Sequence, residues 1–427
     1  MKNFKELGLS HNLLKIIDEI GFLEPSEIQE KIIPIALTGK DVIGKSATGS
    51  GKTLAFGAPI IEKMHKGKGL KALVLVPTRE LAEQVSKSIL SFSKYNPLKI
   101  MSVYGGVPIN HQIINLRTAD LVVGTPGRIL DHISRNTIDL SKIQFLVLDE
   151  VDRMMDMGFL YDVTKIIEQC PRVRQNFLFS ATIPREILQI SKKYMNNPVE
   201  VSVESYIDAS KLEQIYYQVP TNQKFSLLVH LLKKENSKLV MVFCNTKRNT
   251  DFIGNSLRKN DFDALALHGD LSQGKRKKVL ESFNKGTKFI LVCTDVAARG
   301  LDIKNVSHVY NYDTPKTSTE YIHRIGRTAR AGKEGKAITI LSERDYDNFS
   351  RVLEDSSLNI KKVPVPQFER AFVHIPNNNF SSRSTGNRNF SSRRDDNEGH
   401  RRFGERNNRN YGRSNPRNFH RRERSYR

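Results

Sequence analysis

The chain has 427 residues, a formal net charge of +22 and a pI near 9.8. That length predicts two or three domains, each with its own core, and the positive charge favours nucleic acid over a membrane surface as partner. Cys170, Cys244 and Cys293 are too widely spaced for a disulfide framework or a clustered zinc site, and no apolar run has the length of a signal or membrane segment, so a cytoplasmic location is expected.

The N-terminal segment predicts a helix followed by two residues of interest. Ser10 precedes apolar residues at helical spacing, and Gly21 ends the pattern. Beyond it, Phe22 offers an aromatic face for adenine and Gln29 an amide that can pair with the edge of that base. Taken alone, the two residues favour a core aromatic and a surface amide.

The segment Ser46–Thr53, with the sequence SATGSGKT, predicts a loop that binds phosphates. A short apolar strand precedes it and a helix over Lys52–Met64 follows, so loop N–H groups and the helix dipole face an anion. Lys52 is expected to reach the terminal phosphates and Thr53 to ligate Mg²⁺. A glycine-containing turn before a helix is the alternative interpretation.

The written phosphate-loop pattern fits a different segment, Gly39–Ser46, which we reject. That match would place the β-branched Val42 and Ile43 inside the loop, and a Gly- and Ser-rich stretch would have to start the helix. Sequence context therefore favours Ser46–Thr53.

Short apolar runs alternate with helical patterns as far as about Val203, which predicts a parallel sheet with helices on both faces. Ligands bind such sheets at the carboxyl ends of the strands, and polar motifs directly follow several of these runs. The runs are Ala72–Val76, Ile100–Val103, Leu121–Val123, Phe145–Leu148, Phe177–Phe179 and Val199–Val203.

Asp149 and Glu150 follow the apolar run Phe145–Leu148. One carboxylate of such a pair can hold Mg²⁺ while the other polarises an attacking water. A charge pair at a helix N-terminus is the alternative, and the nearby phosphate loop favours the metal and water roles.

A second series of strands and helices follows a segment without periodicity, but it lacks a convincing phosphate loop. Arg324, Arg327 and Arg330 recur every third residue, so a helix would gather them near one face, where they could meet phosphate or simply be solvated. The apolar runs are Ile215–Val219, Leu239–Phe243, Ala264–Leu267, Phe289–Val292, Val309–Tyr312 and Ala337–Leu341.

The composition changes from about Ala371 onwards. Residues 371–427 contain 14 Arg, no Lys, no Leu and 5 acidic residues, a net charge of +9 within 57 positions. Such a segment buries too little apolar surface to fold, and its arginines and spaced aromatics suit RNA or single strands. A passive solubilising tail is the alternative.

From about Phe4 to Leu341 the chain resembles the DEAD-box family of ATP-dependent RNA helicases, through the order and spacing of about ten motifs. The resemblance implies an α/β fold of two tandem RecA-like domains that bind ATP, Mg²⁺ and RNA. The expected parts are helicase domain 1 at 1–205, a linker at 206–212, a C-terminal helicase domain at 213–363 and a disordered RNA-binding tail at 364–427.

The same resemblance implies roles at the nucleotide. Phe22 and Gln29 would bind adenine, and Gly300 and Asp302 would contact the nucleotide from the second domain. The phosphates would be bound by the loop residues Ser46, Ala47, Thr48, Gly49, Ser50, Gly51, Lys52 and Thr53. The catalytic residues would be Lys52, Asp149 and Glu150, with Arg327 and Arg330 as arginine fingers. Thr53 and Asp149 would hold Mg²⁺, partly through water. The residues that couple ATP state to RNA binding would be Asp152, Ser180, Thr182 and His323.

RNA contacts are implied at motifs of both domains, mainly to the backbone. The chain departs from the family pattern in three places: Val151 and Ser46 each stand where Ala is usual, and the pair Ser26-Glu27 stands where Thr-Pro is usual. The implied RNA-binding residues are Arg79, Gly106, Thr125 and Arg128 in the first domain and Thr246, Gly269, Arg276 and Thr294 in the second.

The function expected from this resemblance is RNA-stimulated ATP hydrolysis coupled to local unwinding of short duplexes and remodelling of RNA–protein complexes, by a monomeric core that ribosomal or decay complexes could recruit. Two alternatives remain open. One is a DNA helicase of the same superfamily, and the other an RNA-binding or annealing protein in which ATP is only a switch.

Overall fold

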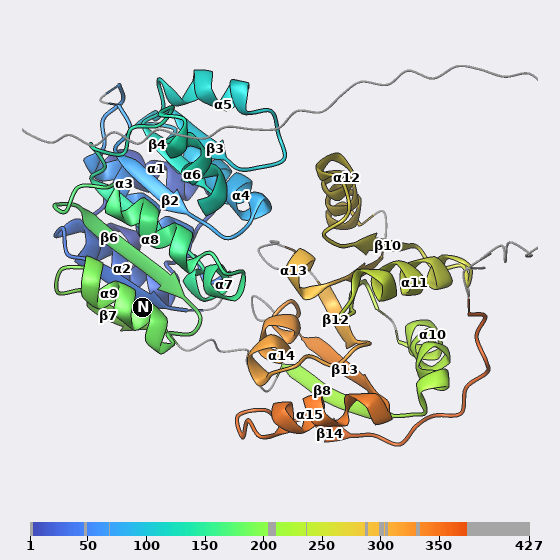
Figure 1. The fold of residues 1–427 in the computed structure, drawn as a ribbon. Coiled ribbons are helices and arrows are strands. Elements are labelled where there is room, and N and C mark those ends of the chain that lie inside the picture. Colours follow the sequence, from blue (N-terminus) through green and yellow to red (C-terminus); the bar gives the residue numbers. More distant parts are fainter. Residues whose placement is uncertain are drawn as a thin grey trace, which may run out of the picture. The chain divides into compact units, whose positions relative to one another are not determined.

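The computed structural model describes residues 3–46, 49–67, 69–203, 211–235, 237–286, 289–298, 303, 306–329 and 334–373. These residues form two seven-stranded parallel sheets with flanking helices (Figure 1). We refer to residues 3–203 as the first domain and to residues 211–373 as the second domain.

The first sheet has the strand order β3-β4-β2-β5-β6-β1-β7, and its paired strands run parallel. Strands β2, β4, β5 and β6 are buried on both faces, as expected for a parallel sheet between helices. The strands are β1 (Val42–Lys45), β2 (Ala72–Leu75), β3 (Ile100–Val103), β4 (Leu121–Gly124), β5 (Phe145–Leu148), β6 (Gln175–Ser180) and β7 (Val199–Ser202).

Alternation along the first sheet's strands divides their side chains between two apolar clusters. Val74 and Val147 lie in the cluster packed against α1 to α4. Leu73, Leu75, Leu146 and Leu148 point to the opposite face and lie in the cluster packed against α6 to α9. The helices are η1 (Phe4–Leu7), α1 (His11–Ile20), α2 (Glu27–Leu37), α3 (Lys52–Lys63), α4 (Arg79–Phe92), α5 (Ile109–Leu116), α6 (Pro126–Ser134), α7 (Val151–Asp156), α8 (Leu160–Glu168) and α9 (Arg185–Tyr194).

The predicted first helix is confirmed together with its ends. Ser10 caps α1 by accepting a hydrogen bond from the Leu13 N–H at 3.4 Å, and Gly21 ends the helix with φ +84°.

The second sheet has the order β10-β11-β9-β12-β13-β8-β14, again with parallel pairing. Its strands are β8 (Leu212–Gln218), β9 (Leu239–Phe243), β10 (Ala264–Leu267), β11 (Ile290–Cys293), β12 (Val306–Asn311), β13 (Gly335–Leu341) and β14 (Lys361–Lys362). The helices are η2 (Thr221–Gln223), α10 (Lys224–Lys234), α11 (Lys247–Arg258), α12 (Gln273–Asn284), α13 (Asp295–Ala298), α14 (Ser318–Ile325), η3 (Glu343–Asp345) and α15 (Tyr346–Leu353).

The two sheets repeat one topology. Each strand of the first sheet from β1 to β6 has a counterpart from β8 to β13, and the six counterparts take the same lateral order. The tandem α/β architecture predicted from the sequence is therefore confirmed.

Residues 361–373 form an extended strap on the second domain. The Val363 N–H donates to the Tyr216 carbonyl at 3.0 Å, and the Ala371 N–H donates to Ser226 Oγ at 3.1 Å. Phe368 packs against the core under α10. The packed chain therefore continues beyond residue 364, where the tail was expected to begin, and residues 374–427 lie outside the described part.

Candidate active site

The predicted site residues of the first domain follow the carboxyl ends of six adjacent strands. Ser46, Asp149 and Ser180 follow or end β1, β5 and β6, while Arg79, Gly106 and Thr125 follow β2, β3 and β4. The lateral order therefore separates the two groups. The predicted RNA contacts occupy one half of this edge, and the predicted nucleotide contacts occupy the other.

The loop after β1 has the backbone that a phosphate cradle requires. Gly49 and Gly51 have φ values of +86° and +93°, and Gly51 is the N-cap of α3. The rejected pattern at Gly39–Ser46 contains β1 itself, so that segment is a strand and the choice of Ser46–Thr53 is supported.

Gln29 and Ser26 bind the phosphate loop directly. Gln29 Nε2 donates to the Gly51 carbonyl at 3.0 Å, Ser26 Oγ donates to the Ser50 carbonyl at 2.7 Å, and Gln29 Oε1 accepts from the Ser26 N–H at 2.9 Å. A Cβ on Gly51 would lie 2.4 Å from Gln29 Nε2, so only glycine fits there. The Gln29 amide keeps one N–H and one lone pair for a base.

Phe22 lies on the loop after α1 with a side chain that is 39% exposed, which leaves a ring face available for stacking. Its ring centroid is 6.3 Å from that of Phe92 in a tilted arrangement.

Lys52 and Asp149 meet behind the phosphate loop. Lys52 Nζ lies 3.8 Å from Asp149 Oδ1 and donates to the Ser46 carbonyl at 3.3 Å; both side chains are almost fully buried. Asp149 Oδ1 accepts no hydrogen bond from any residue that the structure describes. Burial raises the pKa of Asp149 to about 6, because it outweighs the opposing effect of Lys52. A buried carboxylate oxygen with an open lone pair suits a divalent cation.

The raised pKa of Asp149 predicts a pH-dependent stability for the metal-free protein. The folded-state value of about 6 exceeds the unfolded value, so this group's contribution is present at low pH and is lost as pH rises through 6. With EDTA, wild type should lose about 2 kcal/mol of first-domain stability relative to Asp149→Asn between pH 4.5 and 7.5.

Modification of Cys170 measures this effect. The Cys170 thiol is buried in the first domain, and burial raises its pKa to about 11, so a thiol reagent attacks it only after opening. The Cys170 labelling rates of wild type and Asp149→Asn, measured on the Cys170 peptide at the same pH, give the difference in first-domain stability between the two proteins at that pH. A difference that stays constant between the two pH values would contradict the prediction.

Glu150 connects β5 to α7 in an αL conformation with φ +54°. Its carboxylate forms an ion pair with Arg153 of α7, and both side chains are about 5% exposed. Arg153 was not among the predicted residues, although its position three residues after Glu150 would be a signal for an ion pair if a helix starts there. The neighbouring Val151 is fully buried in the core, so its additional methyl groups are accommodated.

Asp152, Ser180 and Thr182 form a hydrogen-bonded network. Asp152 Oδ2 accepts from the N–H groups of Ala181 and Thr182, both at 3.0 Å, and the Asp152 N–H donates to Ser180 Oγ at 3.2 Å. The Ser180 hydroxyl donates to the Thr182 carbonyl at 2.6 Å. This network joins the helix that follows Glu150 to the loop after β6.

The predicted RNA-binding residues of the first domain also lie together. A Cβ on Gly106, whose φ is +80°, would lie 1.9 Å from Arg79 Nη1, so the absence of a side chain lets the guanidinium cover this loop. Arg128 donates from both Nη atoms to the Val107 carbonyl at 3.2 Å. Thr125 is the N-cap of α6, the helix that carries Arg128.

In the second domain, the predicted RNA contacts follow three adjacent strands, β10, β11 and β9. Thr246 caps α11 by accepting from the Asn249 N–H at 3.1 Å, and Thr294 Oγ1 accepts from the Ala297 N–H at 3.4 Å. Gly269 lies beside Lys247, and Arg276 Nη1 donates to the His268 carbonyl at 3.3 Å.

The expectation of three arginines on one helical face is wrong. Helix α14 ends at Ile325, so Arg327 lies beyond it, and Arg324 is only 1% exposed. Arg324 donates to both Asp295 carboxylate oxygens, at 2.7 and 2.6 Å, and to Asn245 Oδ1 at 2.8 Å. This arginine therefore connects α14 to α13 and to the loop after β9. Arg327 is 4% exposed, and His323 is half-buried on α14.

Five predicted site residues lie outside the described residues: Ala47, Thr48, Gly300, Asp302 and Arg330.

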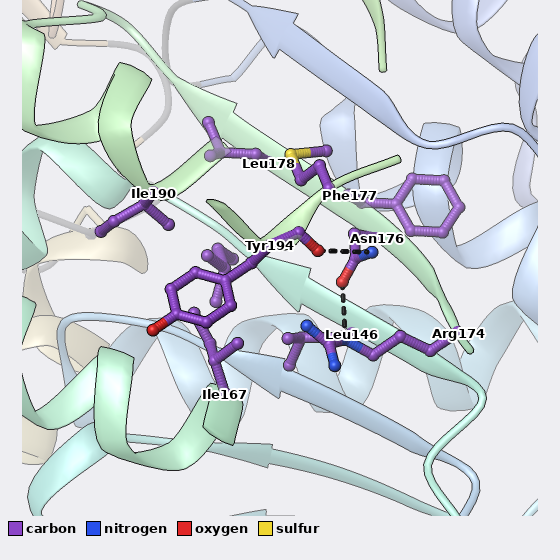
Figure 2. A pocket seen from close by; sticks show the side chains of 10 residues that line it. Leu146, Ile167, Arg174, Asn176, Phe177, Leu178, Ile190 and Tyr194 are labelled. Carbon is purple, nitrogen blue, oxygen red and sulfur yellow. Dashed lines mark hydrogen bonds between the residues drawn. The ribbon is translucent and has the colours of Figure 1, made fainter. Parts of the chain in front are cut away.

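Two hollows lie away from these residues. One, of about 10 Å³, lies between β5, β6, α8 and α9, where Asn176 hydrogen-bonds Arg174 and the Tyr194 carbonyl (Figure 2). Its walls are apolar and its volume is that of about one water, so it is a packing defect. A cleft of about 600 Å³ opens beside the amino ends of β8 and β13, at the opposite edge from the predicted residues.

The described residues contain neither a membrane-spanning helix nor a clustered metal site. Among their helices, none combines the length and apolar character needed to cross a bilayer. Their His, Cys, Asp and Glu side chains form no group of three or more that could hold a metal ion.

Fold and site together define a tandem RecA-like nucleotide-binding protein. Two family models match the chain, "DEAD/DEAH box helicase" over residues 26–190 and "Helicase conserved C-terminal domain" over residues 223–332. The chain belongs to the DEAD/DEAH box helicase family, which confirms the resemblance seen in the sequence.

Relatives and solved structures agree. The ATP-dependent RNA helicase CshA of Listeria monocytogenes is 44% identical over 376 residues, which are 87% of this chain and 72% of the relative. That of Geobacillus kaustophilus is 43% identical over 374 residues, 87% and 80% of the two chains. The structure of S. cerevisiae Dbp5 bound to RNA and ADP BeF3 matches with a TM-score of 0.78 at 31% identity, covering 86% of this chain and 96% of that one.

Proposed function

We propose that this protein is an ATP-dependent RNA helicase that couples RNA-stimulated ATP hydrolysis to local unwinding of short duplexes and remodelling of RNA–protein complexes. The observation that carries the proposal is the arrangement around Asp149. Lys52 of the phosphate loop, after β1, and the acidic pair after β5 meet across the end of β6, beside a second group of residues suited to a phosphate backbone. The relatives named as RNA helicases support the same activity.

ATP would bind with its phosphates on the N-terminus of α3 and adenine beside Phe22 and Gln29. Because Gln29 also bonds the Gly51 carbonyl, base recognition would stabilise the phosphate loop. Asp149 and Thr53 would hold Mg²⁺ partly through water, and that ion would neutralise developing phosphate charge. Glu150 would accept a proton from the attacking water, which requires its carboxylate to turn from Arg153 towards the γ-phosphate.

Coupling would arise from closure of the two domains around ATP and RNA. Arg327 and Arg330 would reach the γ-phosphate only in the closed form, and the RNA-binding residues of both domains would grip one backbone only then. Within the first domain, the Asp152–Ser180–Thr182 network would transmit the state of the nucleotide. Dbp5 was solved with RNA and ADP BeF3, in which BeF3 stands in for the γ-phosphate, so that relative binds both ligands at once.

RNA and DNA can be distinguished by ATPase assays with oligoribonucleotides and oligodeoxyribonucleotides of one sequence. We expect stimulation by RNA alone, since only RNA carries the ribose 2′-hydroxyl by which a protein can distinguish it from DNA. Stimulation by DNA alone would overturn the proposal in favour of a DNA helicase.

We also propose the domain organisation expected from the sequence, except that an RNA-binding tail would begin after the packed strap, at residue 374. The core would be monomeric and cytoplasmic, and ribosomal or decay complexes are candidate partners. Deleting residues 374–427, so that the packed strap remains, should weaken RNA affinity and flatten its salt dependence while basal ATP hydrolysis is retained. Affinity titrations at several salt concentrations measure the slope. An unchanged slope would show that the tail does not contact RNA.

A further inference from the structure

A buried polar network lies behind the loop of residues 104–107, and none of the roles proposed above uses it. Its central residues are Gln112 on α5, which is 5% exposed, and His132 on α6, which is fully buried. Burying two such side chains is unfavourable unless their hydrogen bonds are satisfied, so their partners indicate what they hold in place.

Gln112 binds three partners. Its Nε2 donates to the Tyr104 carbonyl at 3.0 Å, and its Oε1 accepts from Arg128 Nη1 at 3.1 Å. The same oxygen lies 3.1 Å from His132 Nε2. Because an amide oxygen can only accept, His132 Nε2 carries the proton. Its Nδ1 lies 2.8 Å from Thr137 Oγ1, and that hydroxyl also donates to the His132 carbonyl at 3.1 Å.

The protonation state of His132 agrees with this assignment. Burial, followed by the positive charge of Arg128, lowers the pKa of His132 and favours the neutral ring; Arg135 acts in the same direction, and Asp131 opposes it. A neutral ring with Nε2–H blocks the flipped orientation of the Gln112 amide. Flipping would point the amide NH₂ at both the imidazole N–H and the Arg128 guanidinium.

Two arginines converge on the loop that this network supports. A Cβ on Gly105 would lie 3.6 Å from Arg79 Nη2 and 3.9 Å from Arg128 Nη2, so both guanidiniums border that position. Arg128 also holds the Val107 carbonyl at 3.2 Å, while Gln112 holds the Tyr104 carbonyl at 3.0 Å. Two guanidiniums beside a fixed loop suit a backbone phosphate.

We propose that Gln112 is a positioning residue for RNA binding, which orients the Arg128 guanidinium and the loop of residues 104–107 so that they can grip a backbone phosphate. His132 fixes the orientation of the Gln112 amide. The inference rests on the proposed contact of Arg128 with RNA.

A double-mutant cycle on the full chain tests this inference with the variants Gln112→Ala, Arg128→Ala and both together. Gln112→Ala should raise the KM for RNA in the ATPase assay about tenfold, the effect of one lost charge-assisted hydrogen bond, with kcat at saturating RNA within about twofold. In the Arg128→Ala background it should raise KM clearly less than in the wild-type background, since part of its effect acts through that arginine and only the bond to the Tyr104 carbonyl remains.

Two controls separate positioning from general damage. His111→Ala removes an exposed side chain of the same helix and should leave KM for RNA unchanged. Gln112→Met keeps the volume, should raise KM as Gln112→Ala does, and should leave Cys170 as protected as in wild type.

The possible outcomes are distinguishable. The positioning role of Gln112 would be overturned if the two substitutions changed KM additively. It would also be overturned if Gln112→Ala lowered kcat by as large a factor as it raised KM. In both cases RNA-stimulated hydrolysis would stand. An unaltered KM in Arg128→Ala would overturn the positioning role as well, together with the RNA contact of that arginine. Absence of any RNA stimulation in wild type would instead defeat the proposed function.

Discussion

Replacing Glu150 by Gln is expected to lower RNA-stimulated ATP hydrolysis by roughly 10² to 10⁴-fold, the usual contribution of a positioned general base. The amide keeps the shape of the carboxylate but cannot accept a proton at neutral pH. Glu150 also forms an ion pair with the buried Arg153, so some loss of first-domain stability is expected in addition.

Nucleotide-dependent RNA binding separates these two effects. Glu150→Gln should bind RNA in the presence of ATP at least as long as wild type does, because the closed form would persist when hydrolysis is blocked. The comparison needs the rates of single-turnover hydrolysis and of RNA dissociation. Both should be measured under conditions in which Cys170 is protected from labelling in both proteins, so that the first domain is folded in each.

Two results would contradict this role for Glu150. Hydrolysis within about tenfold of wild type would mean that another group activates the water. Unimpaired multiple-turnover strand separation by a variant that no longer hydrolyses ATP would favour the alternative in which ATP is only a switch.

Hydrophobic periodicity located the strands well because the sheets are buried on both faces. β3, β5, β9 and β10 have the predicted limits, and each is a short run of mainly apolar residues that a parallel sheet requires. The two-residue strand β14 was missed, since Lys361 and Lys362 are exposed and carry no apolar signal.

The nucleotide side of the site was predictable because its residues stand at fixed offsets from strand ends. The contacts among them were not. Gln29 was expected to face adenine, and its bond to Gly51 joins segments 22 positions apart. Gln112 and His132 are a further example, because an amide on one helix and an imidazole 20 positions later have no spacing that marks a contact.

Arg324 shows why spacing alone misled. A three-residue period predicts a common face only if the helix continues, and α14 ends one residue after Arg324. The guanidinium instead enters the domain, where Asp295 and Asn245 satisfy it and the ring of Phe243 lies 5.3 Å from its central carbon. Charge patterning carries no sign that Arg324 leaves the helical face for the interior of the domain.

The contrast between these arginines yields the second large effect that we expect. Arg327→Lys should lower RNA-stimulated hydrolysis by about 10³ to 10⁵-fold if the guanidinium acts as a finger on the γ-phosphate, and lysine cannot reproduce its planar fork. Arg324→Lys should instead destabilise the second domain by roughly 3–5 kcal/mol, because Asp295, Asn245 and Asn311 lose a shared buried partner.

Cys244 and Cys293 make that distinction measurable, since both are fully buried in the second domain and burial raises the pKa of each thiol well above its usual value. Arg324→Lys should speed their labelling at least tenfold, whereas Arg327→Lys should speed it clearly less than Arg324→Lys does. If Arg327→Lys exposed these cysteines as strongly as Arg324→Lys does, its loss of activity would reflect an unfolded second domain. A finger at the γ-phosphate would then have to be sought at another residue.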